Sequence, residues 1–261
     1  MRFSASHIAT KLILLTGLMV SGKALANDTA DYELIFESTW SAATHPISFP
    51  PGPHFSGLIG GTHNDTISLW EAGGIASDGI ELMAEIGSKT LLQNEVNAAI
   101  GNGQAGAVIS GPGIALSPGS ASVQFTVSKD FPLVSVVSMI APSPDWFVGV
   151  SGVSLRSGNQ WIREIVIPLQ PYDAGTDSGS TYLSPNADVT PHEPIFEIMG
   201  PPLTSSPPAP PLGTFTIRRL GTAVPAAQSW SLILIALTLM TTGTLLTLSN
   251  RQTVDKVNAA D

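Results

Sequence analysis

Three aspartates in the second half of the chain have the residue type and spacing of a cation site. Asp145 lies in the run APSPDWF at 141–147, and Asp173 and Asp177 lie in the glycine-containing segment 171–179. Carboxylates held close together raise each other's pKa, and a hard cation relieves their repulsion. Ca²⁺ takes about 6–8 oxygen ligands from carboxylates and carbonyls, whereas Mg²⁺ usually keeps more of its water. Ordinary turn residues are the alternative, because aspartate forms local hydrogen bonds in turns.

Two expected strands determine whether these aspartates meet. The apolar runs 146–155 and 161–169 read as strands, and the intervening RSGNQ at 156–160 is a turn signal. A hairpin of these strands would bring the loop 171–179 back beside the start of the first strand. The sequence therefore predicts that the three carboxylates lie together at one end of a sheet.

The remaining patterns predict an all-β body. Apolar and polar residues alternate over 32–37 and 122–128, as in strands with one wet face, and 133–140 is apolar and β-branched, as in a central strand. Later strands are expected at 195–199 and 214–220. Antiparallel strands at this spacing predict a β-sandwich. The proline-rich segment 200–212 is expected to be extended and to belong to the same domain.

One stretch has helical spacing. Asp78 and Glu81 resemble a capping box that opens a short helix through Ile86. Apolar residues at 91–100 continue the helical pattern, and Gly101 is a plausible stop. We expect one or two short helices that cover an edge of the sandwich.

Composition limits the classes of function. Charged residues make up 12% of the 261, with 25 glycines and 21 prolines, which suits a β-rich body with many turns. The formal net charge is −9, and residues 1–26 hold three basic and no acidic residues, so the rest carries −12. An acidic surface repels phosphates and argues against nucleic acid as a partner. The absence of cysteine excludes disulfides and thiolate chemistry.

Both ends of the chain read as targeting segments. Residues 1–26 match a secretory signal peptide with cleavage after Ala26; an uncleaved anchor is the alternative. The uncharged run 230–248 is long enough to span a bilayer, and Arg251 and Lys256 after it predict a cytoplasmic tail at 252–261. A buried core helix is the alternative for this run. Residues 223–251 together resemble the C-terminal sorting signals of Gram-negative envelope proteins.

Four groups of motifs, in order over roughly 31–220, resemble the spondin domain. They are YELIFESTWS at 32–41, HFS with LIG and THN between 54 and 64, SMIAPSPDWFVGV at 138–150, and PYDAGTDSG at 171–179. The resemblance implies a β-sandwich similar to C2 domains, in proteins of extracellular matrix and adhesion. It places calcium ligands on Asp145, Asp173 and Asp177. The lack of cysteine departs from the animal members.

We interpret the chain as an exported, membrane-anchored module that binds Ca²⁺ and has no catalytic activity. Its domain would occupy 27–222, on the outer side of a bacterial inner membrane or at the cell surface. The expected partners are the membrane and extracellular glycans or envelope proteins. The alternative is a calcium-dependent hydrolase of the envelope, for which Glu193, Glu197 or His192 would have to supply a general base.

Overall fold

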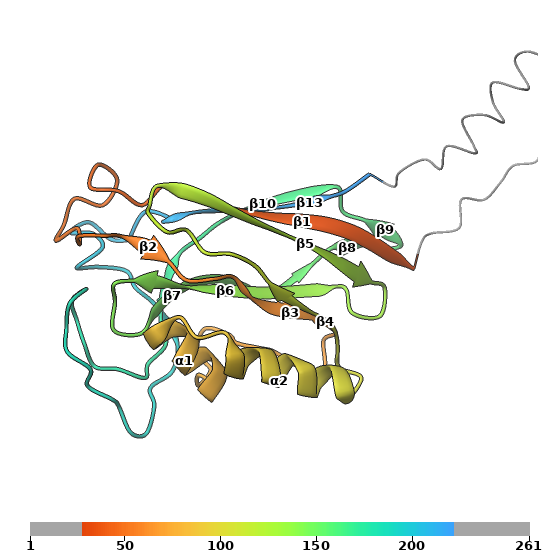
Figure 1. The fold of residues 1–261 in the computed structure, drawn as a ribbon, viewed down its shortest axis with the longest axis horizontal. Coiled ribbons are helices and arrows are strands. Elements are labelled where there is room, and N and C mark those ends of the chain that lie inside the picture. The colour runs from red at the N-terminus through yellow and green to blue at the C-terminus, as the bar shows by residue number, and fades with distance from the viewer. Residues whose placement is uncertain (1–27, 222–261) are drawn as a thin grey trace, which may run out of the picture.

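The structure is a computed structural model that describes residues 28–221, and two β-sheets packed face to face form its body (Figure 1). The four-stranded sheet has the order β10-β13-β1-β5. Its strands are Glu164–Pro168 (β10), Gly213–Arg219 (β13), Thr29–Ser38 (β1) and Gly119–Ser128 (β5). All three pairings in it are antiparallel. The predicted all-β sandwich is confirmed.

The second sheet has seven strands in the order β12-β11-β7-β6-β3-β4, with β2 also paired to β6. Its strands are Phe196–Glu197 (β12), Pro171–Asp173 (β11), Trp146–Ser154 (β7), Leu133–Ala141 (β6), Ile59–His63 (β3), Ala105–Ser110 (β4) and His54–Phe55 (β2). A small hairpin of Arg156–Ser157 (β8) and Gln160–Trp161 (β9) lies apart from both sheets.

Strand β1 shows how the sequence builds the interior. Tyr32, Leu34 and Phe36 are fully buried between the sheets, while Glu33 and Glu37 alternate with them on the outer side. The ring of Phe36 lies edge-on to Phe55 and Phe215, with centroids 4.8 and 5.2 Å apart. Because successive strand residues point to opposite faces, the alternation read from the sequence fixes which side faces the core.

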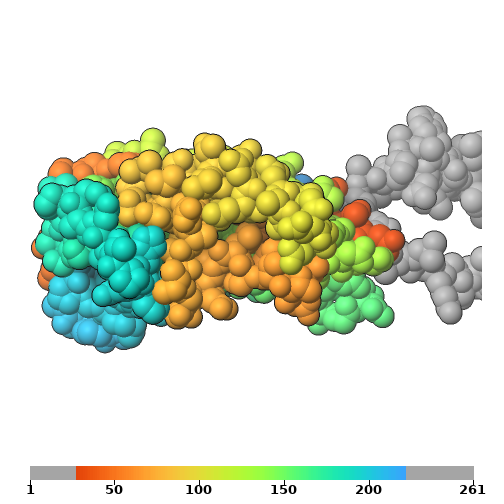
Figure 2. All heavy atoms as spheres, turned by 90° about the horizontal axis from the view of Figure 1, so that it is seen from below, coloured from red at the N-terminus to blue at the C-terminus, as the bar shows by residue number. Residues whose placement is uncertain are grey.

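Two helices, Asp78–Ile86 (α1) and Thr90–Gly101 (α2), lie on the outer face of the seven-stranded sheet (Figures 1 and 2). The expectation that they cover an edge holds for α2, which packs chiefly against the edge strand β4, while α1 packs against β6 inside the sheet. The reason is that β6 is apolar on both sides, so its outer face also needs cover. Gly61 of β3 allows the close approach, because a Cβ there would lie 2.7 Å from a methyl of Val96 in α2.

The helix ends differ slightly from the sequence reading. The N-cap of α1 is Ser77, whose hydroxyl accepts a hydrogen bond from the Ile80 amide, and not Asp78. The carboxylate of Glu95 in α2 completes the cap by accepting from the Gly79 amide and the Ser77 hydroxyl, both at 2.7 Å. After α2, the residue with positive φ is Gly103 and not Gly101.

The path between β7 and the loop 171–179 also differs from the expected hairpin. The expected strand 161–169 is divided, and its second part, β10, pairs with β13 in the opposite sheet. The chain then returns to the seven-stranded sheet as β11, which pairs antiparallel with β7. The prediction of a hairpin was wrong because β10 completes the edge of the other sheet. Strand β11 still brings the loop 171–179 to the start of β7.

Within residues 28–221, no helix has the length and apolar character needed to cross a bilayer. The predicted signal peptide at 1–26 and the run at 230–248, with its sorting signal and cytoplasmic tail, lie outside the described residues.

Candidate functional site

The three aspartates predicted from the sequence meet at one end of the seven-stranded sheet. Asp145 directly precedes β7, and Asp173 ends β11 opposite Trp146 in the β11–β7 register. Asp177 follows four residues later. All three are buried, with exposures of 0%, 9% and 4% for Asp145, Asp173 and Asp177. Burial of three carboxylates in one region is costly unless each charge is compensated.

Backbone amides of the loop supply part of that compensation. The Asp145 Oδ2 atom accepts hydrogen bonds from the amides of Thr176 and Asp177, at 2.8 and 3.1 Å. Asp173 accepts from the Gly175 amide at 2.8 Å and from the Trp146 indole at 3.0 Å. These bonds close the loop around the Asp145 side chain, so the loop conformation depends on that carboxylate.

Asp177 holds the other side of the same loop. Its two oxygens accept from the amides of Gly179 and Ala187, at 2.6 and 2.7 Å. Gly175 makes the bend possible, because its φ is +74° and a Cβ there would lie 2.2 Å from the carbonyl oxygen of Glu193. The aspartates therefore have the turn-forming role that the sequence left open.

Two carboxylate oxygens in this region have no hydrogen-bond partner. They are Asp145 Oδ1 and Glu85 Oε1, and both are buried. Glu85 lies in α1 and interacts with the Thr176 side chain and with the charge of Asp145. Such atoms are rare in folded proteins, and a proton or a bound cation compensates a buried carboxylate of this kind.

Glu85 was missed by the sequence reading. It lies 60 positions before Asp145, and in the sequence it is an ordinary helix glutamate. In α1, Glu85 directly follows the apolar residues Met83 and Ala84, both of which are buried, and this apolar pair was the one sequence signal that the turn faces the protein. Only the packing of α1 on the sheet places its carboxylate beside the loop.

Burial shifts the pKa values of these carboxyls upward. Desolvation raises the pKa of Asp145, with a smaller contribution from the charge of Asp177. Burial, followed by the charge of Asp145, raises the pKa of Asp173 to about 7. Burial is also the largest cause of the raised pKa of Glu85. The site therefore favours either protons or a compensating cation.

A cleft of about 310 Å³ reaches the site from solvent. Its lining includes Asp173, Asp177, Trp146 and Glu193. Within residues 28–221, no three histidine or acidic side chains are arranged to hold one metal ion. The close contact is between Asp145 and Asp173, while Asp177 directs both of its oxygens to loop amides.

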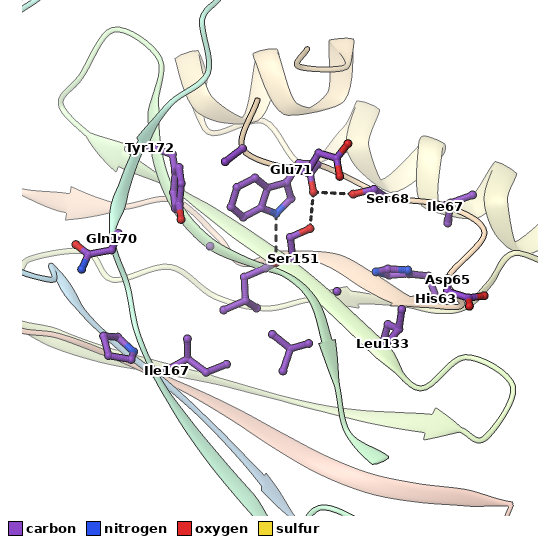
Figure 3. Close-up of a pocket in the computed structure, with 17 residues that line it drawn as sticks. His63, Asp65, Ile67, Ser68, Glu71, Leu133, Ser151, Ile167, Gln170 and Tyr172 are labelled. Carbon is purple, nitrogen blue, oxygen red and sulfur yellow. Dashed lines mark hydrogen bonds between the residues drawn. The ribbon is translucent and has the colours of Figure 1, made fainter. Parts of the chain in front are cut away.

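A larger cleft of about 610 Å³ lies elsewhere, between the segment after β3 and strands β7 and β11 (Figure 3). It is lined by His63, Trp70, Glu71, Tyr172 and others, and it contains none of the three aspartates. The Trp70 carbonyl accepts from the hydroxyls of Ser68 and Ser151 at its wall (Figure 3). Size alone does not identify the functional site, and the buried carboxylates favour the smaller cleft.

The residues considered as general bases are differently placed. Glu193 lines the smaller cleft, whereas His192 faces Glu81 with a nitrogen–oxygen distance of 3.9 Å. Glu197 lies in β12 opposite Tyr172. Of the three, Glu193 alone borders the cleft that reaches the aspartates.

Comparison with known proteins places the chain in a family. The Spondin_N family model matches residues 30–211. Spondin-2 of Homo sapiens is 35% identical over 230 residues, which cover 83% of this chain and 67% of the relative. Spondin-1 of Mus musculus is 38% identical over 183 residues, which cover 68% of this chain but 22% of the relative. The chain belongs to the spondin N-terminal domain family.

Proposed function

We propose that the protein is an exported, membrane-anchored spondin-domain module that binds Ca²⁺ and acts in adhesion or envelope structure without catalysis. The observation that carries the metal is the pair of buried carboxyls of Asp145 and Asp173, which contact each other while no N–H or hydroxyl group donates to Asp145 Oδ1. A divalent cation would compensate both charges. The expected absence of nucleic acid as a partner rests on the acidic composition.

The residues present suit a calcium ion. Asp145 and Asp173 would hold it, with loop carbonyls supplying further oxygens. Asp177 and Glu85 would join them only after the loop and the Glu85 side chain rearrange, because no three acidic side chains of residues 28–221 are grouped around one ion position. The oxygens that already accept an amide hydrogen keep a second lone pair for a metal. The donor set is entirely oxygen, which a hard cation prefers. Bound calcium would brace the loop 173–187 against the sheet and helix α1.

Export and anchoring rest on the targeting segments at 1–26 and 223–251. Family membership supports an extracellular setting, because the spondin resemblance implies matrix and adhesion proteins. Glycans or envelope proteins are the partners we propose on that basis. The chain spans 22% of mouse Spondin-1, so partners of the longer relatives are not carried over.

A calcium-dependent hydrolase remains the second candidate, because Glu193 borders the cleft that reaches Asp173. It would need a carboxylate free to act as a base toward a substrate on the metal. Calcium-dependent turnover of an ester, phosphoester or glycoside substrate, lost in Glu193→Gln, would establish it in place of the adhesion module.

The decisive experiment is a calcium titration of the full chain, purified in neutral detergent and stripped with a chelator. At 100 times the Kd, calcium should stabilise the folded state by about 2.7 kcal/mol, which raises the Tm by about 5 °C or more for a domain of this size. Asp145→Asn should abolish the rise. An asparagine oxygen can keep the bonds to Thr176 and Asp177, while its amide group occupies the position of the unpartnered oxygen and cannot bind a cation.

The matched control is Asp65→Asn, which changes an exposed aspartate outside the site. It should leave the calcium-induced rise unchanged. If the wild type shows no rise at millimolar calcium, the aspartates are turn residues alone and the calcium proposal is wrong.

A further inference from the structure

The basic residues of the domain gather at the end opposite the aspartates. Residues 28–221 contain eighteen acidic residues and six lysines or arginines. Five of the six lie at the end where β1 begins and β13 ends (Figure 1). They are Lys129, Arg156, Arg163, Arg218 and Arg219; the sixth, Lys89, lies between the helices. Acidic residues, among them Asp28, Asp31 and Asp130, lie at the same end, so the pairing of each basic residue decides whether its charge is compensated.

Three of these arginines form no ion pair with a carboxylate of residues 28–221. Within the described part of the chain, Arg218 pairs with Glu33 at 2.6 Å and Lys129 with Asp130 at 3.0 Å. No ion pair within 4 Å includes Arg156, Arg163 or Arg219 among those same residues. Their guanidinium groups therefore keep hydrogen-bond donors for a further acceptor.

Two of these arginines, Arg163 and Arg219, line one cleft. A cavity of about 410 Å³ is lined by Trp161, Arg163, Arg219, Leu220 and Gly221, with no acidic residue among them. The backbone holds its two sides together, because the Arg219 amide donates to the Arg163 carbonyl at 2.8 Å.

The third arginine, Arg156, contacts a residue of the cleft lining. Arg156 lies over the Trp161 ring, 4.8 Å from its centroid. Two guanidinium groups in the lining and a third beside it make the cleft suited to a phosphate, which arginine binds through paired N–H donors.

The position of the cleft favours a membrane lipid as the molecule that carries the phosphate. Gly221 lies in its lining, and the apolar run expected to span the membrane begins at residue 230. The nine chain steps from Gly221 to residue 230 can span at most about 32 Å. If the run is in the bilayer, the cleft is held close to the lipid headgroups, where basic side chains bind anionic lipids.

We propose that the arginine cleft binds the phosphate headgroup of an anionic membrane lipid and so orients the domain on the membrane. The cation-binding end would then face away from the bilayer. This inference rests on the proposed membrane anchoring, and it is independent of calcium.

The test uses the full chain in neutral detergent, with its Tm followed during titration with dihexanoyl phosphatidylglycerol. We expect a rise in Tm that weakens as NaCl is added, because salt screens exposed charges. Dihexanoyl phosphatidylcholine, whose phosphate is balanced by a cation, should give a much smaller rise. Arg163→Gln and the double variant with Arg219→Gln should lower the affinity for phosphatidylglycerol by about tenfold or more, since each removes charge-assisted hydrogen bonds.

Arg218→Gln is the matched control, because Arg218 already pairs with Glu33 and should bind phosphatidylglycerol as the wild type does. Arg163→Gln changes an exposed residue, so it keeps the test valid if the double variant fails to fold. An equal rise with inorganic phosphate would overturn the lipid as the source, and no rise with any probe would overturn the site. Extraction of the chain from membranes by alkaline carbonate would separately refute the anchoring.

Discussion

Glu85, Asp145 and Asp173 share an environment in which their charges oppose one another. Each has its pKa raised chiefly by burial, and two of their oxygens have no hydrogen-bond partner. Carboxyl groups this close titrate as a coupled set, and the shift of Asp173 belongs partly to Asp145. Without a cation, the folded state therefore favours protonation; with one, it favours ionisation.

This difference predicts a pH dependence that calcium reverses. The pKa of Asp173 is raised from 3.8 to about 7 in the folded, calcium-free chain, so the folded state holds its proton more tightly than the unfolded state does. The stability from this group is fully present below about pH 4 and is lost as the pH rises through about 7. In EDTA, the Tm of Asp173→Asn relative to wild type should therefore increase between pH 5 and 8.

The variant loses one hydrogen bond at every pH, because both oxygens of Asp173 accept N–H donors, so the trend with pH is the relevant quantity. In saturating calcium at pH 7.5, wild type should be the more stable of the two. A difference that stays constant with pH in EDTA would contradict the assignment.

Glu85 gives a second prediction for the same site. Its Oε1 atom is buried without a partner, so Glu85→Gln should stabilise the calcium-free chain at pH 7.5, by about 1 kcal/mol, because it removes a desolvated charge. The same variant should weaken calcium binding if the carboxylate contributes to the ion. Urea unfolding with and without calcium measures both effects, and Glu71→Gln, which changes an exposed glutamate outside the site, is the control. If Glu85→Gln lowers the free energy of unfolding in EDTA, neighbouring groups already compensate the Glu85 charge and the prediction is wrong.

The site depends on elements that approach it from different parts of the chain. β11 pairs with β7 and sets Asp173 opposite Trp146, while α1 supplies Glu85 from the outer layer. Helix α1 is itself held by α2, through the Glu95 carboxylate at its first turn. A carboxylate at a helix N-terminus accepts free amides and interacts favourably with the helix dipole.

The Glu95 cap is testable. Glu95→Ala should destabilise the domain by about 2 kcal/mol, because two hydrogen bonds to a charged group are lost. Gln93→Ala changes an exposed residue of the same helix and should have little effect. Urea unfolding measures both variants, and equal stabilities would show that the cap does not contribute.

At the scale of the whole molecule, the two ends of the described chain and the proposed calcium site lie at opposite ends of the sandwich. The described part begins and ends beside the arginine cleft, while the aspartates lie at the far end of the sandwich (Figure 1). A module anchored at residue 230 would therefore carry its proposed calcium site away from the membrane.

Cleavage of the signal peptide and anchoring by the apolar run 230–248 can each be measured directly. Intact mass spectrometry of the protein from membranes should give a mature chain that begins at Asn27. A chain terminated after Ser229 should appear in the soluble exported fraction, because it lacks the apolar run 230–248. A mass that includes residues 1–26 would contradict the signal peptide, and continued membrane association of the shortened chain would contradict the anchor.

The sequence by itself determined the sandwich, its buried and exposed strand faces, the family and the three aspartates. Two kinds of signal are local: the alternation of apolar and polar residues in strands such as β1, and the motifs at 138–150 and 171–179. Local signals can be recognised without the tertiary structure. The crossing of β10 into the opposite sheet, the position of the helices on a face, and the approach of Glu85 and Glu95 were decided only by the tertiary structure. Each depends on which distant residues compete for the same edge or surface, and local spacing does not encode that competition. The clustering of the arginines around one cleft has the same origin, because β9, β10 and β13 meet only when the sheets close.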